Sequence, residues 1–347
     1  MSLPFDPACL PLLLGGLPHR NVAQALEVSR RYAGALLAWP QLPQRSFREH
    51  SYVQSAIGFP GLVIDAMRGQ VYVDHAAAEQ ELDRLALAYL EDDLDYAALA
   101  ADDASGLYEL LRQGERPRGT LALKGQLLGP ISLAAHLTDE RHRPLIYDDV
   151  LLEALVHHLR LRAEWQEARL GEVSDTTIIC LDEPFLETVG SPFLPLDWPT
   201  ARDRIDEVLE GITGCRAIYA GGAVEWTEVL RTSADLIIAD VYDHSRALIA
   251  AAAELPAFLE RGGIVGLGLI PTDAETLKHT TAESLVAHAE AVICALGEAG
   301  VAPDQFVRRA VVSTSDTLSR LEIGAAERAL QLVSEVSALL RQTYALG

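Results

Sequence analysis

Short hydrophobic runs alternate along the chain with longer segments in which apolar positions recur at a helical period. The runs are apolar throughout, which is typical of parallel strands buried on both faces. They predict eight strands, over residues 11–18, 36–43, 120–130, 176–184, 216–222, 236–242, 264–271 and 308–316. The amphipathic segments predict helices over residues 21–35, 149–172, 200–212, 225–233, 244–263, 281–300 and 324–346.

The pattern changes after the second predicted strand. Residues 61–74, GLVIDAMRGQVYVD, hold two apolar runs around Arg68-Gly69, which predicts a hairpin. Helical segments then continue to about residue 115. Eight strand–helix units predict an α/β fold, a single (β/α)8 TIM barrel over residues 1–347, with a hairpin and helices inserted after strand 2. A doubly wound open sheet is the alternative, but no G-x-G-x-x-G motif follows the first strand.

Charge and composition narrow the classes of partner. The chain has 28 basic and 50 acidic residues, a net charge of −22, which repels nucleic acid and anionic membrane surfaces. No apolar stretch reaches the length of about 20 residues that a membrane span needs, and no signal-peptide pattern opens the sequence. The four cysteines form no C-x-x-C pair, which favours free thiols in a reducing compartment. We therefore expect a cytoplasmic protein with a small-molecule substrate.

Polar side chains follow most of the predicted strands. In a TIM barrel these positions meet at the carboxyl ends of the strands, where active sites lie. Asp182-Glu183-Pro184 is the strongest candidate, because it places carboxylates directly after a buried strand, suited to binding an ammonium group or transferring a proton. The position of His19 fits substrate binding and helix capping equally well. For Asp316, helix capping is likewise the alternative to a role in the site. The full candidate set is Gly15, Gly16, His19, Glu49, Lys124, Asp182, Glu183, Tyr219, Asp240 and Asp316.

Five strings in order resemble one known family. They are GGLPH (15–19), WPQLPQRSFREHSYVQ (39–54), GFPG (58–61), KGQLLGPISL (124–133) and LDEPFL (181–186). Together they resemble the cobalamin-independent methionine synthase family, and more closely its short single-barrel members, within the superfamily shared with uroporphyrinogen decarboxylase. The resemblance runs from about residue 15 to residue 340.

The resemblance implies a TIM barrel and methyl transfer to a thiol such as homocysteine, through a thiolate bound to zinc. It implies that Asp182 holds the ammonium group of the substrate, and that Glu49 and the Gly15-Gly16 backbone help to bind the amino acid. The long members of the family carry an N-terminal barrel involved in folate binding, which this chain lacks. A methylated corrinoid protein is therefore the expected methyl donor.

The loop AIYAGGAVEW (217–226) departs from the family pattern. The family's His-x-Cys zinc ligands fall at Tyr219 and Gly221, its last zinc cysteine falls at Asp316, and its acidic ligand falls at Asp240. Zinc that activates thiols prefers sulfur and nitrogen donors. The resemblance thus implies zinc, but the residues present predict no zinc ligands.

Two cysteines lie near this loop in the sequence. Cys180 and Cys215 sit deeper in their predicted strands than the ligand positions, which favours core packing.

Three functions remain open on the sequence. The first is a methyltransferase-like enzyme with Asp182 and Asp240 as catalytic residues and with an altered site. The second is a metal-free, decarboxylase-like enzyme on the same barrel, which would use carboxylate and cationic side chains. The third is a non-catalytic member that binds a small molecule or a corrinoid protein.

Overall fold

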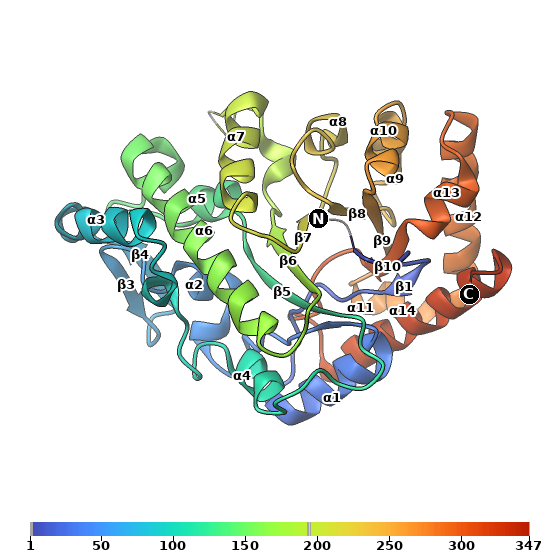
Figure 1. Ribbon diagram of the computed structural model, residues 1–347, viewed down its shortest axis with the longest axis horizontal. Coiled ribbons are helices and arrows are strands. Elements are labelled where there is room, and N and C mark those ends of the chain that lie inside the picture. The colour runs from blue at the N-terminus through green and yellow to red at the C-terminus, as the bar shows by residue number, and fades with distance from the viewer. Residues whose placement is uncertain (1–2, 193, 195, 347) are drawn as a thin grey trace.

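The barrel predicted from the sequence is confirmed by a computed structural model, which describes residues 3–192, 194 and 196–346. Eight parallel strands stand side by side in the order β1-β10-β9-β8-β7-β6-β5-β2, with helices around them (Figure 1). Their bounds are β1 Leu10–Pro11, β2 Leu36–Ala38, β5 Ala122–Leu128, β6 Thr177–Asp182, β7 Cys215–Ala220, β8 Leu236–Asp240, β9 Ile264–Ile270 and β10 Ala310–Thr314.

The ring closes between β1 and β2 through isolated bridges rather than a continuous ladder. Leu12 pairs with Leu36, and Gly16 pairs with Gln41. Both strands are shorter than the sequence predicted. Gly15 has a φ of +116°, which interrupts the extended backbone of the first run, and Pro40 lacks the N–H that a continued second strand would donate.

The helices cover the outside of the barrel. Their bounds are α1 Val22–Ala33, α5 Pro130–His136, α6 Asp149–Gly171, α7 Trp198–Leu209, α8 Trp226–Val229, α9 Ser245–Ala250, α10 Leu255–Glu260, α11 Ala274–His279, α12 Ala282–Glu298, α13 Pro303–Arg308 and α14 Ile323–Thr343. The single helix predicted over 244–263 is wrong, because it divides into α9 and α10. Pro256 lies in the first turn of α10, where its missing N–H costs nothing, whereas inside a helix it would break the hydrogen-bond ladder.

The predicted insertion after strand 2 is confirmed. It comprises η1 Phe47–Glu49, α2 Ser51–Ala56, the hairpin strands β3 Leu62–Asp65 and β4 Gln70–Val73, α3 His75–Leu90, η2 Leu94–Ala97 and α4 Ser105–Leu111. The hairpin and α3 lie at the left edge of the molecule in Figure 1, outside the ring of strands.

Alternate residues of β6 face different layers. Ile178 and Cys180 pack inside the barrel, whereas Ile179 and Leu181 pack against the outer helices. Cys215 also lies inside, so both cysteines pack in the core as expected. The interior is filled by these side chains together with aliphatic residues from the other strands, so a ligand site must lie above it. Among the described residues, no helix is both long and apolar enough to cross a membrane.

Candidate functional site

A pocket opens at the carboxyl ends of the strands. The empty space among its side chains is about 740 Å³, part of it open to solvent, which suits a small metabolite. Five of the predicted site residues line this pocket, namely Gly16, Glu49, Asp182, Tyr219 and Asp316. Three further lining residues, His50, Tyr52 and Arg320, are not in the predicted site set.

Asp182 is a pocket carboxylate with few protein partners. It ends β6 and is partly exposed to the pocket. Among the described residues, the one hydrogen bond that it accepts comes from the thiol of Cys180, at 3.5 Å between Sγ and Oδ1. Burial raises the pKa of Asp182 to about 6, the nearby charge of Asp316 also raises it, and Lys124 opposes the shift. A carboxylate with this pKa changes charge just below neutral pH.

The neighbouring Glu183 has the opposite environment. Its side chain is fully buried and lies behind the pocket, at the N-terminus of α5. Its Oε1 accepts the N–H of Ile131 at 3.0 Å, and its Oε2 accepts that of Ser132 at 2.7 Å. A Cβ atom at Gly129 would lie 2.2 Å from Oε1, so this close approach requires glycine. Burial raises the pKa of Glu183 to about 7, against the lowering effect of these hydrogen bonds.

The other two predicted aspartates are held by backbone and side-chain donors. Asp240 accepts the N–H groups of Tyr242 and Asp243 on Oδ1, at 3.1 and 3.2 Å, and burial raises its pKa. Asp316 accepts the N–H of Thr317 at 2.6 Å and the Tyr219 hydroxyl at 3.2 Å, both on Oδ1. Asp316 is exposed at the pocket, whereas Asp240 lies outside the pocket lining.

Lys124 lies inside the barrel rather than in the pocket lining. Its side chain is fully buried, and Nζ donates to the carbonyl of Leu14 at 3.0 Å and to Oε1 of Gln126 at 3.3 Å. Gln126 in turn donates to the carbonyl of Trp39 at 2.9 Å. Lys124 therefore joins β5 to the segment that follows β1, and its charge favours the ionised form of Asp182.

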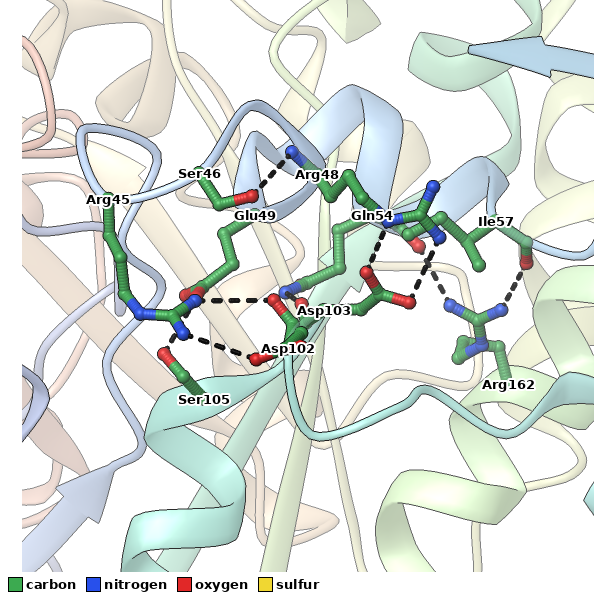
Figure 2. A network of polar contacts seen from close by, with 10 residues as sticks. All are labelled: Arg45, Ser46, Arg48, Glu49, Gln54, Ile57, Asp102, Asp103, Ser105 and Arg162. Carbon is green, nitrogen blue, oxygen red and sulfur yellow. Dashed lines mark hydrogen bonds and ion pairs between the residues drawn. The ribbon is translucent and has the colours of Figure 1, made fainter. Parts of the chain in front are cut away.

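Glu49 belongs to a polar network on one side of the pocket. Its Oε1 accepts Nη1 of Arg45 at 2.5 Å and the Ser105 hydroxyl at 2.7 Å, and its Oε2 accepts the N–H of Leu42 at 3.1 Å. Figure 2 shows this cluster beside the ion pair of Arg48 with Asp103, whose closest atoms are 2.5 Å apart. Glu49 is fully buried, so its oxygen atoms are already occupied by protein donors.

The same network fixes α2 to α6. The buried Arg162 donates to the carbonyl groups of Gln54, at 2.8 Å, and of Ile57 (Figure 2). His158 lies 3.1 Å from the carbonyl of Ser55. These contacts satisfy carbonyl groups at the C-terminal end of α2, the helix that carries Tyr52 to the pocket.

His19 lies away from the pocket. It is fully buried, and its Nε2 lies 3.3 Å from a carboxylate oxygen of Glu327 on α14. Gly15, also outside the lining, allows close packing, because a Cβ atom there would lie 2.5 Å from the side chain of Gln126. Among the described residues, the structure thus brings five predicted residues to the pocket and places Gly15, His19, Lys124, Glu183 and Asp240 around it.

The residues at the family's zinc positions do not fit a zinc ion. The Tyr219 hydroxyl donates towards the Ser315 carbonyl at 2.9 Å and lies 3.2 Å from Asp316 Oδ1. Burial raises the pKa of Tyr219 well above its usual value, so the phenol stays neutral. A Cβ atom at Gly221 would lie 3.1 Å from this hydroxyl, which therefore occupies space beside the position of a ligand side chain. In the described part of the chain, no three His, Cys, Asp or Glu side chains are grouped to hold a metal.

The three missed residues come from segments that the sequence analysis had already quoted. His50 and Tyr52 lie one and three residues after Glu49, and Arg320 lies four residues after Asp316 in TSDTLSRL. The ring of Tyr52 lies against that of His136, tilted by 38°, with 3.8 Å between the ring centroids. Burial and the charge of Arg320 lower the pKa of His50. No chemical motif marks these positions, since each depends on how a loop folds back over the barrel.

Comparisons with known proteins support the barrel. No protein-family model and no curated protein matches the sequence. Among solved structures, the fold is similar to a B12-independent methionine synthase from Shewanella sp. W3-18-1 in complex with selenomethionine, with a TM-score of 0.59 and 15% identity over 96% of this chain and 98% of that one. It is also similar to a methyltransferase from Methanosarcina mazei, with a TM-score of 0.52 and 11% identity over 92% and 86% of the two chains. At these identities the likeness shows the fold alone, a single (β/α)8 TIM barrel.

Proposed function

We propose that this chain is a methyltransferase-type enzyme whose acceptor is a small thiol amino acid such as homocysteine, bound at the barrel mouth. The observation that carries the proposal is the Asp182 carboxylate, which faces the pocket and accepts, among the described residues, the Cys180 thiol hydrogen bond alone. Such a group suits an ammonium ion. The fold likeness to two methyltransferases, one of them complexed with an amino acid, adds support.

The other pocket residues suggest how the reaction proceeds. Asp182 binds the ammonium group and orients the acceptor. The acceptor sulfur attacks the methyl carbon, so that an S–C bond forms while the donor's bond to the methyl group breaks and its electron pair stays with the donor. The thiol proton passes to Oδ2 of Asp316, since the hydrogen bonds of this carboxylate to Thr317 and Tyr219 use Oδ1. The proposed donor is a methylated corrinoid protein.

No step passes through zinc, because Tyr219, Gly221, Asp240 and Asp316 do not form a zinc-type donor set. Elemental analysis after adding zinc and dialysing tests this point directly. Near-stoichiometric zinc would show that the zinc positions have been assigned wrongly.

Methyl transfer itself is tested with methylcobalamin as the donor probe and homocysteine as the acceptor, with methionine measured by mass spectrometry. We expect methionine to form faster than it does without protein. The Asp65→Asn variant, in the hairpin, should keep this activity, and the Asp182→Asn variant should lose it. Formation of methionine at the uncatalysed rate would contradict the proposal.

The raised pKa of Asp182 favours a second candidate, a metal-free decarboxylase-like enzyme. A carboxyl group with a pKa of about 6 can give a proton to a carbanion left by loss of CO₂. Release of CO₂ from small carboxylic acids, lost in Asp182→Asn, would favour this candidate over methyl transfer. Ligand binding without either reaction would favour a binding protein.

A further inference from the structure

The charged groups of the pocket are unequally distributed. Its lining contains three carboxylates, Glu49, Asp182 and Asp316, and one arginine, Arg320. Glu49 is neutralised by the contact with Arg45, and Asp316 is held by Tyr219 and the following N–H group. Asp182 therefore lacks a cationic partner or a strong donor, Asp316 keeps its Oδ2 atom open, and Arg320 is the one Arg or Lys side chain among the described residues that line the pocket.

Arg320 is free to meet a ligand. It lies in the loop between β10 and α14, is exposed, and makes no ion pair or hydrogen bond within the part of the chain that the structure describes. Its charge nevertheless reaches the pocket wall, because it lowers the pKa of His50 and opposes the burial that raises the pKa of Tyr52. A guanidinium group in this position offers two parallel N–H donors to a carboxylate.

Some of the backbone groups beside the pocket are already hydrogen-bonded to each other. The Gln41 N–H donates to the Gly15 carbonyl at 3.0 Å, and the Leu17 N–H donates to the Gln41 carbonyl at 2.9 Å. The Thr317 hydroxyl approaches the Gly16 carbonyl at 3.5 Å. These contacts close the barrel between the first two strands, and among the described lining residues Arg320 is the one Arg or Lys side chain that can bind an anionic group.

From this arrangement we infer that Arg320 binds the carboxylate of the ligand while Asp182 binds its ammonium group, so that the pocket selects zwitterionic amino acids. The inference rests on the proposed function for the identity of the site and adds a residue that determines specificity. A ligand that lacks either charged group should lose one of the two contacts.

The test uses three probes of similar size. L-Methionine carries both charges, 3-(methylthio)propylamine lacks the carboxylate, and 4-(methylthio)butanoate lacks the ammonium group. Their affinities are measured by isothermal titration calorimetry on the full chain and on Arg320→Ala, Arg320→Lys and Asp182→Asn. Arg68→Ala is the matched control, since Arg68 lies at the turn of the hairpin, with its side chain 77% exposed.

We expect Arg320→Ala to weaken methionine and 4-(methylthio)butanoate by about tenfold or more and to leave the amine within about twofold. Arg320→Lys should recover part of the loss, because an ammonium group keeps the charge but not the paired donors. Asp182→Asn should weaken methionine and the amine but spare the butanoate. Arg68→Ala should bind all three probes like the parent protein.

Other results would overturn the assignment. An equal loss of all three probes in Arg320→Ala would mean a structural role, and no loss would mean that the carboxylate binds elsewhere. Failure of all three probes to bind the parent protein would also refute it. If the expected pattern appears but no methyl transfer is found, the proposed reaction fails and the assignment of Arg320 stands.

Discussion

Acidic and basic residues lie on both sides of the barrel mouth, but they differ in whether they are paired with other protein groups. On the side of α2, shown in Figure 2, the buried carboxylates of Glu49 and Asp103 are paired with the partly exposed Arg45 and Arg48. On the other side, Asp182 and Arg320 face open space without strong protein partners among the described residues. The comparison teaches that an acidic or basic residue indicates a ligand site by its unsatisfied hydrogen-bonding capacity, and not by its type or its closeness to a strand end.

The largest expected effect is on the open side. Asp182→Asn should weaken binding of L-methionine by about 100-fold, because an ammonium ion loses its charged partner in a partly buried site. Isothermal titration calorimetry measures the loss, and Asp65→Asn in the hairpin is the control. Retention of parent affinity in Asp182→Asn would remove the distinction between the two sides.

At Glu183, the next residue, we expect a substitution to lower stability rather than to act on ligand binding directly. Glu183→Ala leaves two buried N–H groups, of Ile131 and Ser132, without acceptors, so we expect the free energy of unfolding to fall by about 2–5 kcal/mol. Urea denaturation followed by circular dichroism measures this change. A stable Glu183→Ala variant that no longer binds ligand would instead place Glu183 in the site.

The pH dependence of binding sharpens the same comparison. The ligand ammonium needs ionised Asp182, whose pKa in the free protein is about 6. Affinity for methionine should therefore be constant above that pH and fall by about tenfold for each pH unit below it, until other groups titrate. The affinity for 4-(methylthio)butanoate, which has no ammonium group, should not show this decline. A pH-independent methionine affinity between pH 4.5 and 7.5 would argue against ammonium binding by Asp182.

Tyr219→Phe should give the smallest effect. It removes the hydroxyl group that links β7 to the end of β10, at a cost of about 1 kcal/mol in the free energy of unfolding. Thermal unfolding monitors the change. Because the protein already satisfies this hydroxyl, methionine affinity should change by less than about threefold. A larger loss of affinity with unchanged stability would mean that the Tyr219 hydroxyl contacts the ligand.

The sequence predicted the barrel well because buried parallel strands leave continuous apolar runs, as IICL before Asp182 does. It predicted the first two strands too long, because pairing there depends on Gly15 and Pro40 rather than on hydrophobicity. The broken helix around Pro256 was missed for the same kind of local reason.

The site was predicted less completely. Strand ends indicate which residues come near the mouth, but they do not tell whether a side chain is already held by its neighbours. Lys124 and Glu183 were expected to bind substrate, and the structure places both among protein partners outside the lining. Arg320 was missed because it lies in a loop whose path depends on packing against distant segments.

The alternation along β6 has a consequence for how such a protein can evolve. Successive residues of this strand face opposite sides of the sheet. Asp182 therefore faces the pocket and Glu183 faces the outer helices because of their positions in that alternation. Inserting or deleting one residue upstream in β6 would exchange the two sides, so that Glu183 would face the pocket and Asp182 would lie behind it. Substitution can therefore retune this site gradually, whereas a single-residue length change in β6 would remove both functions at once, so the length of this strand should be under stricter selection than its individual hydrophobic residues.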